Sequence, residues 1–271
     1  MFHQNLIFDI GLHKGEDADF YLQKGFRVIG VEANPDLSHH CAVRFQNACQ
    51  SGQLTIVNKA IAETPGTIEF YVNDQNSVWG TADKDWMLRN HKLGATSRRM
   101  QVPSVRMDDL LDEYGTPYYM KIDIEGFDHL CISALIGRTD KPRYVSVETH
   151  AWSYAETLKL LTLLSTAGYN TFKIVSQIGV RNQMCPNPAR EGIYVDYPFP
   201  SDASGLFGRE LPGRWLTAGE VKSQFRRIYR NIRMLGPHNG IFRNIRNRHA
   251  VHYLRRLFPG ANDWFDIHAM L

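Results

Sequence analysis

The feature that most constrains the fold is an apolar run that stops at a glycine turn near the amino terminus. The run covers residues 6–10, the turn covers residues 11–15, and a helical pattern follows over residues 16–23. A strand, a glycine turn and a helix in that order cradle a nucleotide-like ligand, because the backbone N–H groups at the helix start point at it. A second apolar run ends in Glu32, 23 residues after Asp9. A carboxylate at that distance typically binds ribose hydroxyls in such folds.

The spacing of the two glycines argues against a dinucleotide ligand. A pyrophosphate site carries G-x-G-x-x-G, in which the second and third glycines give the close backbone packing that the phosphates need. Here the turn reads Gly11-Leu-His-Lys-Gly15. This looser turn suits a ligand that holds an amino acid and an adenosine but no phosphate, with Asp9 for its ammonium group and Glu32 for its ribose. S-adenosylmethionine is such a ligand.

At this point the chain resembles the FkbM family of S-adenosylmethionine-dependent methyltransferases, over roughly residues 5–175. Four segments carry the resemblance: Phe8-Asp9-Ile10-Gly11 with Gly15, Val31-Glu32-Ala33-Asn34-Pro35, residues 58–62 with 66–70, and Lys121-Ile122-Asp123-Ile124-Glu125-Gly126-Phe127-Asp128. The resemblance implies a Rossmann-like class I methyltransferase that acts on hydroxyl groups of sugars, glycans or secondary metabolites. It implies that these residues bind the cofactor: Asp9, Gly11, His13, Lys14, Gly15, Glu32, Ala33, Asn34, Asn58, Ala60 and Asp123.

Alternating strand and helix patterns predict an α/β fold with a mostly parallel, doubly wound sheet. We expect strands near residues 5–10, 27–32, 54–60, 118–123, 143–148 and 171–175, and helices near 16–24, 35–50, 127–136 and 153–167. Residues 68–72 add a hairpin partner, and residues 73–104 look like an irregular insert. The predicted methyltransferase core covers residues 1–175. Residues 176–271 would form a helical, basic extension that serves as a substrate lid or a dimer contact, with one helix over 218–235.

Charge is divided unevenly along the chain. The net charge is +3, but residues 201–271 hold twelve Lys or Arg against five Asp or Glu. A solvated basic helix face explains this better than an anion-binding surface. A nucleic-acid methyltransferase is disfavoured, because the chain has no Asn-Pro-Pro-Tyr-like motif after its fourth strand and few aromatic residues among the arginines. The four cysteines have no metal or disulfide spacing, and no segment has the length or composition of a membrane span or leader, so a cytoplasmic protein is expected.

Two predicted strands end in polar residues, at the edge where parallel sheets bind ligands. The period of two places Lys121, Asp123 and Glu125 on one face, whereas Glu148 and His150 share a face in the next strand. His150 is the favoured general base because its ordinary pKa lies near neutrality. Asp123 would position the site, with Glu148 or Glu125 orienting it.

Other interpretations of these residues remain open. Lys121 and one carboxylate would form a buried pair that orders the strand, and Glu148 and His150 would order a loop. Asp123, Glu148 and His150 also have the chemistry of divalent-metal ligands, although no spacing requires a metal. Apart from an oxygen methyltransferase, the rival functions are a nucleic-acid methyltransferase and a regulatory protein that binds the cofactor without turnover.

Overall fold

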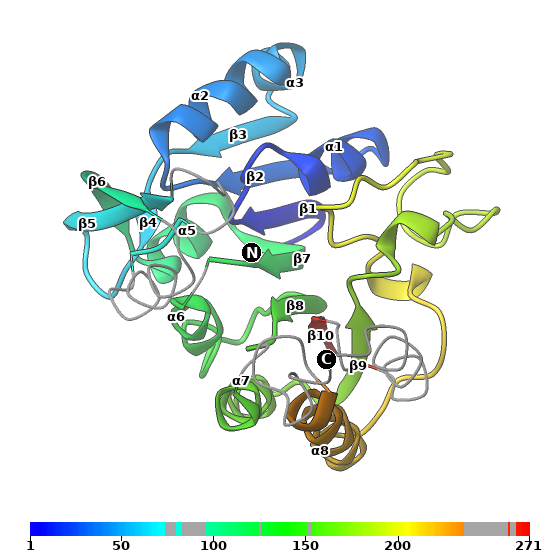
Figure 1. Cartoon of the computed structure of the whole chain (residues 1–271). Helices are drawn as coiled ribbons and strands as arrows, with labels where there is room; N and C mark the ends of the chain where they lie inside the picture. The colour runs from blue at the N-terminus through cyan, green and yellow to red at the C-terminus, as the bar shows by residue number, and fades with distance from the viewer. Residues whose placement is uncertain (74–79, 83–95, 125, 151–152, 236–259, 261–263) are drawn as a thin grey trace, which may run out of the picture.

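The fold is built around one seven-stranded sheet (Figure 1). The computed structural model describes residues 1–73, 80–82, 96–124, 126–150, 153–235, 260 and 264–271. The strand order is β3-β2-β1-β7-β8-β10-β9. Only β10 runs antiparallel to its two neighbours in this sheet. The strands are β1 (Phe2–Ile10), β2 (Arg27–Val31), β3 (Leu54–Val57), β7 (Thr116–Ile122), β8 (Tyr144–Glu148), β9 (Thr171–Ser176) and β10 (Phe265–Met270).

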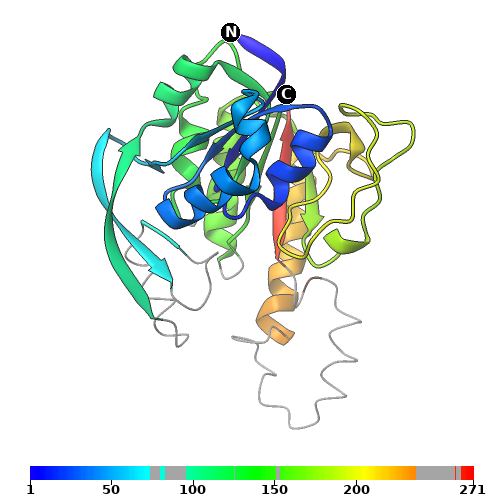
Figure 2. The same ribbon diagram turned by 90° about the horizontal axis from the view of Figure 1, so that it is seen from above.

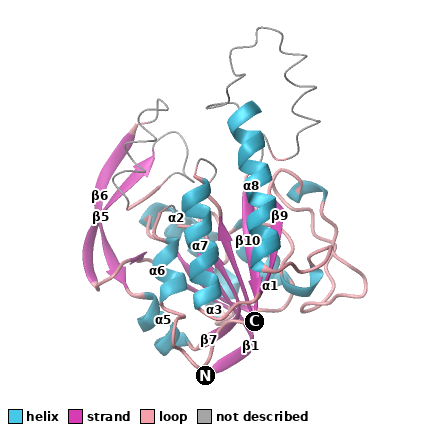
Figure 3. Cartoon of the chain, turned by 90° about the horizontal axis from the view of Figure 1, so that it is seen from below, coloured by secondary structure: helices cyan, strands magenta, loops and turns pink. Residues whose placement is uncertain are grey.

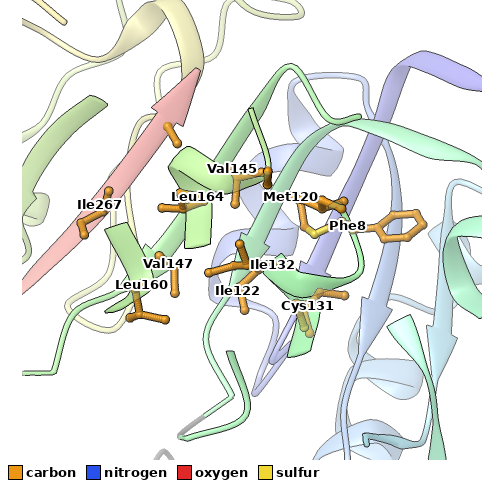
Figure 4. Close-up of a cluster of buried hydrophobic side chains, with 14 of the residues drawn as sticks. Phe8, Met120, Ile122, Cys131, Ile132, Val145, Val147, Leu160, Leu164 and Ile267 are labelled. Carbon is orange, nitrogen blue, oxygen red and sulfur yellow. The ribbon is translucent and has the colours of Figure 1, made fainter. Parts of the chain in front are cut away.

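Both faces of the sheet are covered, as the predicted doubly wound class requires. One face packs on α5 (Met107–Tyr114), α6 (Asp128–Ser133), α7 (Tyr154–Thr166) and α8 (Ala218–Leu235). The other packs on α1 (Glu16–Gln23), α2 (Pro35–Arg44), α3 (Gln46–Gln50) and residues 177–216. Alternate strand residues divide between the two cores, so Phe8, Met120, Val145 and Ile267 share one core (Figure 4). The α/β class predicted from the sequence is therefore confirmed.

Helix ends follow local sequence signals. Asn34 begins α2, because its side chain accepts a hydrogen bond from the Asp36 backbone N–H at 3.0 Å. Ser153 caps α7 through the Glu156 N–H at 3.2 Å. Gly25 follows α1 with a φ of 87°, a conformation that glycine adopts without strain. The helix expected near residues 16–24 is thus confirmed.

A second, three-stranded sheet projects from the core (Figure 2). It consists of β4 (Ala60–Ile61), β6 (Ser97–Val105) and β5 (Gly66–Asn73), in the order β4-β6-β5. The predicted strand over 54–60 was too long, because β3 ends at Val57 and Ala60 pairs with Ser104 in the small sheet. The predicted irregular insert over 73–104 was wrong at its end, where β6 pairs with β5. Residues 74–79 and 83–95 lie outside the described residues.

The segment after residue 175 is part of the fold and only partly helical. Strand β10 lies between β8 and β9, so a core boundary at residue 175 would divide the main sheet. Residues 177–216 include two 3-10 turns, Val180–Asn182 and Gly208–Glu210. They also supply Phe207, which stacks on Tyr119 with ring centroids 4.6 Å apart. Helix α8 covers the residues predicted as a helix and continues away from the sheet (Figure 3).

Candidate active site

The glycine turn after β1 packs tightly against the end of β7. The backbone N–H groups of Gly11 and Leu12 both donate to the Val31 carbonyl at 3.0 Å. Gly11 has a φ of 94°, and a Cβ there would lie 1.9 Å from the Asp123 backbone oxygen. Gly15 has a φ of 78° and immediately precedes α1, and a Cβ there would meet the Phe45 ring at 2.3 Å. Only glycine fits these two positions, and its small size lets the turn pack closely against Asp123 and the Phe45 ring.

Glu32 lies directly beside this turn, at the end of β2. Its carboxylate accepts hydrogen bonds from the His13 backbone N–H at 2.9 Å and the Asn34 N–H at 2.8 Å. The side chain of Asn58 donates to the Glu32 carbonyl at 2.8 Å and to the Ala33 carbonyl at 3.3 Å. Burial raises the pKa of Glu32, although the two backbone donors oppose this. Each carboxylate oxygen keeps a second acceptor site, which is what recognition of a diol needs.

Lys121 forms the centre of a buried ionic cluster on the α1 face of the sheet. Its ammonium group lies 3.4 Å from Asp9, 3.3 Å from Asp17 on α1 and 3.5 Å from Asp123. Asp9 is fully covered, and burial raises its pKa to about 7 despite the neighbouring Lys121. Burial opposes the charge on Lys121, but the surrounding carboxylates raise its pKa well above its usual range. Among the described residues, three carboxylates therefore share the Lys121 ammonium group, which also donates to the Gly11 carbonyl at 3.4 Å.

Asp123 is the most accessible member of this cluster. Its side chain is 40% exposed, and its backbone N–H donates to the Ile10 carbonyl at 2.9 Å, joining the ends of β7 and β1. The loop that follows is held by Asp128, whose carboxylate accepts from the Ile124 N–H at 3.1 Å and the Gly126 N–H at 3.2 Å. Glu125, a predicted orienting residue, lies outside the described residues.

Glu148 and His150 lie at the same carboxyl edge as Asp123. Lys121 pairs with Ser146, so Asp123 and Glu148 continue one row across β7 and β8. The His150 backbone carbonyl accepts from the Ser153 N–H at 3.1 Å and from the Tyr229 hydroxyl of α8. These contacts anchor the loop after β8 to α7 and α8. The edge thus places two polar segments side by side, one with Asp123 and the other with Glu148 and His150.

Of the remaining predicted residues, His13 and Lys14 lie in the glycine turn, whereas Ala60 lies in the small sheet. His13 has a φ of 50°, and its imidazole contacts Glu16 at 3.1 Å. Lys14 lies on the surface, with its carbonyl accepting from Arg44 at 2.7 Å. Ala60 belongs to the small sheet, through its pairing with Ser104.

Sequence reasoning missed two buried carboxylates of this edge. Asp17 accepts the Ser204 backbone N–H at 2.8 Å as well as contacting Lys121. Asp266 is the second residue of β10, lies opposite Glu148 and is 6% exposed. Polar and apolar residues alternate over residues 265–269, with Asp266 and His268 as the polar ones. This period of two predicts a strand.

The described residues contain no group of three or more His, Cys, Asp or Glu side chains arranged to hold a metal ion. This finding gives no support to the metal-site interpretation of Asp123, Glu148 and His150. Within the same described part of the chain, no helix combines the length and apolar character needed to cross a membrane.

The strand order with its antiparallel β10, the glycine turn and the acidic end of β2 define a Rossmann-like methyltransferase fold. The methyltransferase FkbM domain matches residues 9–171, and the chain belongs to that family, whose cofactor is S-adenosylmethionine. No curated protein matches the chain. Among solved structures, the chain is similar to a SAM-dependent methyltransferase from Archaeoglobus fulgidus, with 12% identity, a TM-score of 0.41, and coverage of 99% of this chain and 87% of that one.

Proposed function

We propose that this methyltransferase transfers the methyl group to a hydroxyl of a sugar, glycan or secondary metabolite. The observation that carries the proposal is the polar carboxyl edge beside the glycine turn, where Asp123, Glu148 and His150 follow adjacent strands. A hydroxyl is a weak nucleophile, and a positioned proton acceptor raises its reactivity by typically about 10²- to 10⁴-fold. A site that offers both carboxylate and imidazole groups next to a methyl donor suits that requirement.

The chain's own residues fit the cofactor. Gly11 and Gly15 allow the turn its close packing, because a Cβ at either would meet Asp123 or Phe45. Glu32 is placed to accept the ribose hydroxyls, with Ala33, Asn34, Asn58 and Ala60 lining the adenosine side. His13 and Lys14 lie in the turn, where Lys14 would face the carboxylate of the methionine part.

Asp9 acts through Lys121 in this proposal. Both oxygens of Asp9 are covered, so Asp9 does not contact the ligand directly. It acts by positioning Lys121, which in turn contacts Asp123. Asp123, which is partly exposed, is the carboxylate available to the ammonium group. The sequence predicted Asp9, at the end of β1, as the contact of the ammonium group. This assignment gives that role to Asp123, which follows β7.

S-adenosylmethionine supplies a methyl group on a positively charged sulfur. The protein's contribution is alignment of the acceptor oxygen with the methyl carbon, worth up to about 7–11 kcal/mol in favourable systems, and removal of one proton. His150 accepts that proton, Asp123 positions the reacting groups, and Glu148 or Glu125 orients the site. Residues 176–271 would contact the substrate as a lid or form a dimer contact, since residues 177–216 cover the face that carries Lys121.

The proposal is tested with methyl-labelled cofactor and a panel of glycans, polyketides and RNA. We expect label on an oxygen of a glycan or polyketide, identified by mass spectrometry and NMR of the product. Label found only in RNA would instead support the rival nucleic-acid methyltransferase. Tight cofactor binding without transfer to any acceptor would favour the regulatory function.

A further inference from the structure

Helix α8 carries exposed positive charges that the proposed mechanism does not use. It holds five Lys or Arg residues against one Glu, and all five are exposed. Four of them recur at intervals of three or four residues, so on an α-helix they fall on one side. We call these four the cationic stripe: Lys222, Arg226, Arg230 and Arg233. With a rise of about 1.5 Å per residue, the stripe is about 16 Å long.

The acids of α8 and of the neighbouring helix α7 are paired elsewhere. The single acid of α8, Glu220, forms an ion pair with Arg214 at 2.6 Å. The single acid of α7, Glu156, pairs with Lys159 at 2.7 Å. Neither helix therefore supplies a carboxylate to the cationic stripe. Like charges four residues apart destabilise a helix, so the stability of α8 does not explain the stripe.

The stripe reaches the carboxyl edge of the sheet, beside the proposed proton acceptor. The Phe225 ring meets that of Phe265, the first residue of β10, with centroids 6.4 Å apart. Because β10 is antiparallel, its first residue lies at the carboxyl edge of the parallel strands. One turn further along α8, the Tyr229 hydroxyl donates to the His150 carbonyl. The helix then continues past that edge (Figure 2), which places the second half of the stripe beside the loop that carries His150.

Tyr229 also shows which side of α8 faces this loop. At about 100° per residue, Arg226 and Arg233 lie within about 60° of Tyr229 around the helix axis. The buried residues Val221 and Phe225 lie on the other side of Tyr229. The cationic stripe therefore borders the flank of α8 that contacts the His150 loop.

Opposite charges are separated across this edge. The carboxylates around Lys121 lie on the α1 face of the sheet, whereas α8 packs on the opposite face. S-adenosylmethionine carries positive charges on its sulfur and its ammonium group, so it suits the acidic side. A negatively charged acceptor suits the other side, where the exposed arginines attract it.

We propose that the methyl acceptor is an acidic glycan, whose anionic groups bind the cationic stripe while one of its hydroxyls reaches His150. The inference rests on the proposed function, because it names the substrate class of that hydroxyl transfer. A stripe about 16 Å long exceeds one sugar ring, so it fits a chain with several charges in a row. The exposed residues of α8 are Lys, Arg, Ser and Gly. A face without exposed aromatic or large apolar side chains favours a glycan over stacked bases or a lipid surface.

Binding is tested with a fluorescent oligogalacturonate, a linear glycan with one carboxylate per sugar, and with its methyl ester, which lacks those charges. Each is titrated into the full chain in the presence of saturating S-adenosylhomocysteine. We expect the acid to bind at least about tenfold more tightly than the ester, as two or more exposed ion pairs would give, and to lose this advantage in high salt. Equal affinity for the two glycans at low salt overturns the inference.

A charge reversal locates the binding site. Arg230→Glu should weaken binding of the acid by about three- to tenfold and leave the ester unaffected, and Arg230→Gln should give a smaller loss in the same direction. Arg143→Glu is the matched control, because Arg143 is exposed, precedes β8 at the opposite edge of the sheet and changes the net charge equally. An equal loss in Arg230→Glu and Arg143→Glu overturns the inference. Tighter binding of RNA or of anionic lipid vesicles, lost in Arg230→Glu, overturns it as well and assigns the stripe to that partner.

Methyl transfer separates this inference from the proposed function. With an acidic glycan as the labelled acceptor, Arg230→Glu should raise KM and leave kcat nearly unchanged, because the stripe binds groups away from the reacting atoms. Transfer to neutral glycans alone, with KM unaffected by Arg230→Glu, would keep the proposed function and overturn the acidic acceptor. Binding of the acid through Arg230 without transfer to any hydroxyl would contradict the proposed function and leave the glycan-binding stripe standing.

Discussion

The imidazole of His268 should make the protein lose stability in mild acid, and His268→Phe should remove that loss. His268 is 1% exposed in the middle of β10, and neither ring nitrogen has a hydrogen-bond partner among the described residues. Its ring stacks on Tyr119 with centroids 6.4 Å apart. Phenylalanine keeps this ring contact and cannot bind a proton.

The expected magnitude follows from the pKa of His268. Burial, with a smaller contribution from Lys173, lowers the pKa from 6.5 to about 3. The folded state therefore binds fewer protons than the unfolded chain below pH 6.5, so this contribution to stability falls as pH falls from about 6.5 towards 3. A pH of 5 lies about 1.5 units below the pKa of the imidazole in the unfolded chain. At about 1.36 kcal/mol per unit, the buried imidazole therefore lowers the free energy of unfolding by about 2 kcal/mol at this pH.

Urea denaturation of both proteins at about pH 7.5 and pH 5 measures this effect. Three buried carboxylates have raised pKa values and stabilise the folded state as pH falls, namely Asp9, Asp17 and Asp266. Their contribution to the native protein's stability is therefore opposite in sign to that of His268. The difference between the two proteins cancels those contributions. We expect the variant to gain about 2 kcal/mol relative to the native protein between the two pH values. An unchanged difference would refute the reasoning that His268 is buried in its neutral form.

Three further predictions concern the cofactor and the proton acceptor. Glu32→Ala should weaken calorimetric binding of S-adenosylmethionine by more than tenfold, since hydrogen bonds to a charged group contribute about 1.5–3 kcal/mol each. Unchanged affinity in the folded variant would contradict the ribose assignment. Gly11→Ala should abolish binding because its Cβ would meet the Asp123 backbone at 1.9 Å, whereas Gly25→Ala, in open space, should cost only about 1–2 kcal/mol of stability and leave affinity unchanged. His150→Ala should lower kcat by about 10²- to 10⁴-fold with cofactor affinity preserved, and the acidic limb of the pH–rate profile should disappear. Full activity across pH would place proton removal elsewhere.

The first half of the fold was predictable because its signals are local. The apolar run before Gly11, the strand ending in Glu32 and the cap at Asn34 each depend on neighbouring residues, and β1, β2 and α2 form there. Strand β6 was missed because its residues are largely polar and include Pro103. In β6 the pairing with β5 decides the structure, and no local pattern reports it.

The site was predictable only as separate strand ends. The expected alternation placed Lys121 and Asp123 on one face, and the structure brings both to the α1 side of the sheet. What the sequence could not supply was the number of carboxylates that meet there. Asp17 reads as an ordinary acidic residue in the first turn of a helix, where it also favours the helix dipole. Its contact with Lys121 exists only because α1 packs across β7.

The direction of β10 explains why an acid from the last residues of the chain reaches this site. A parallel strand would bring its final residue to the carboxyl edge, but β10 runs antiparallel and brings Asp266, near its start, beside Glu148. Its later residues, including His268, then continue into the buried centre of the same face. The FkbM domain match ends at residue 171, before this strand begins. The residues proposed to hold the cofactor are thus contained in the matched segment, whereas Asp266, an acid on the same sheet edge, comes from a strand outside it. Variation in the segment after residue 171 can therefore change the charges beside the site while leaving the glycine turn intact.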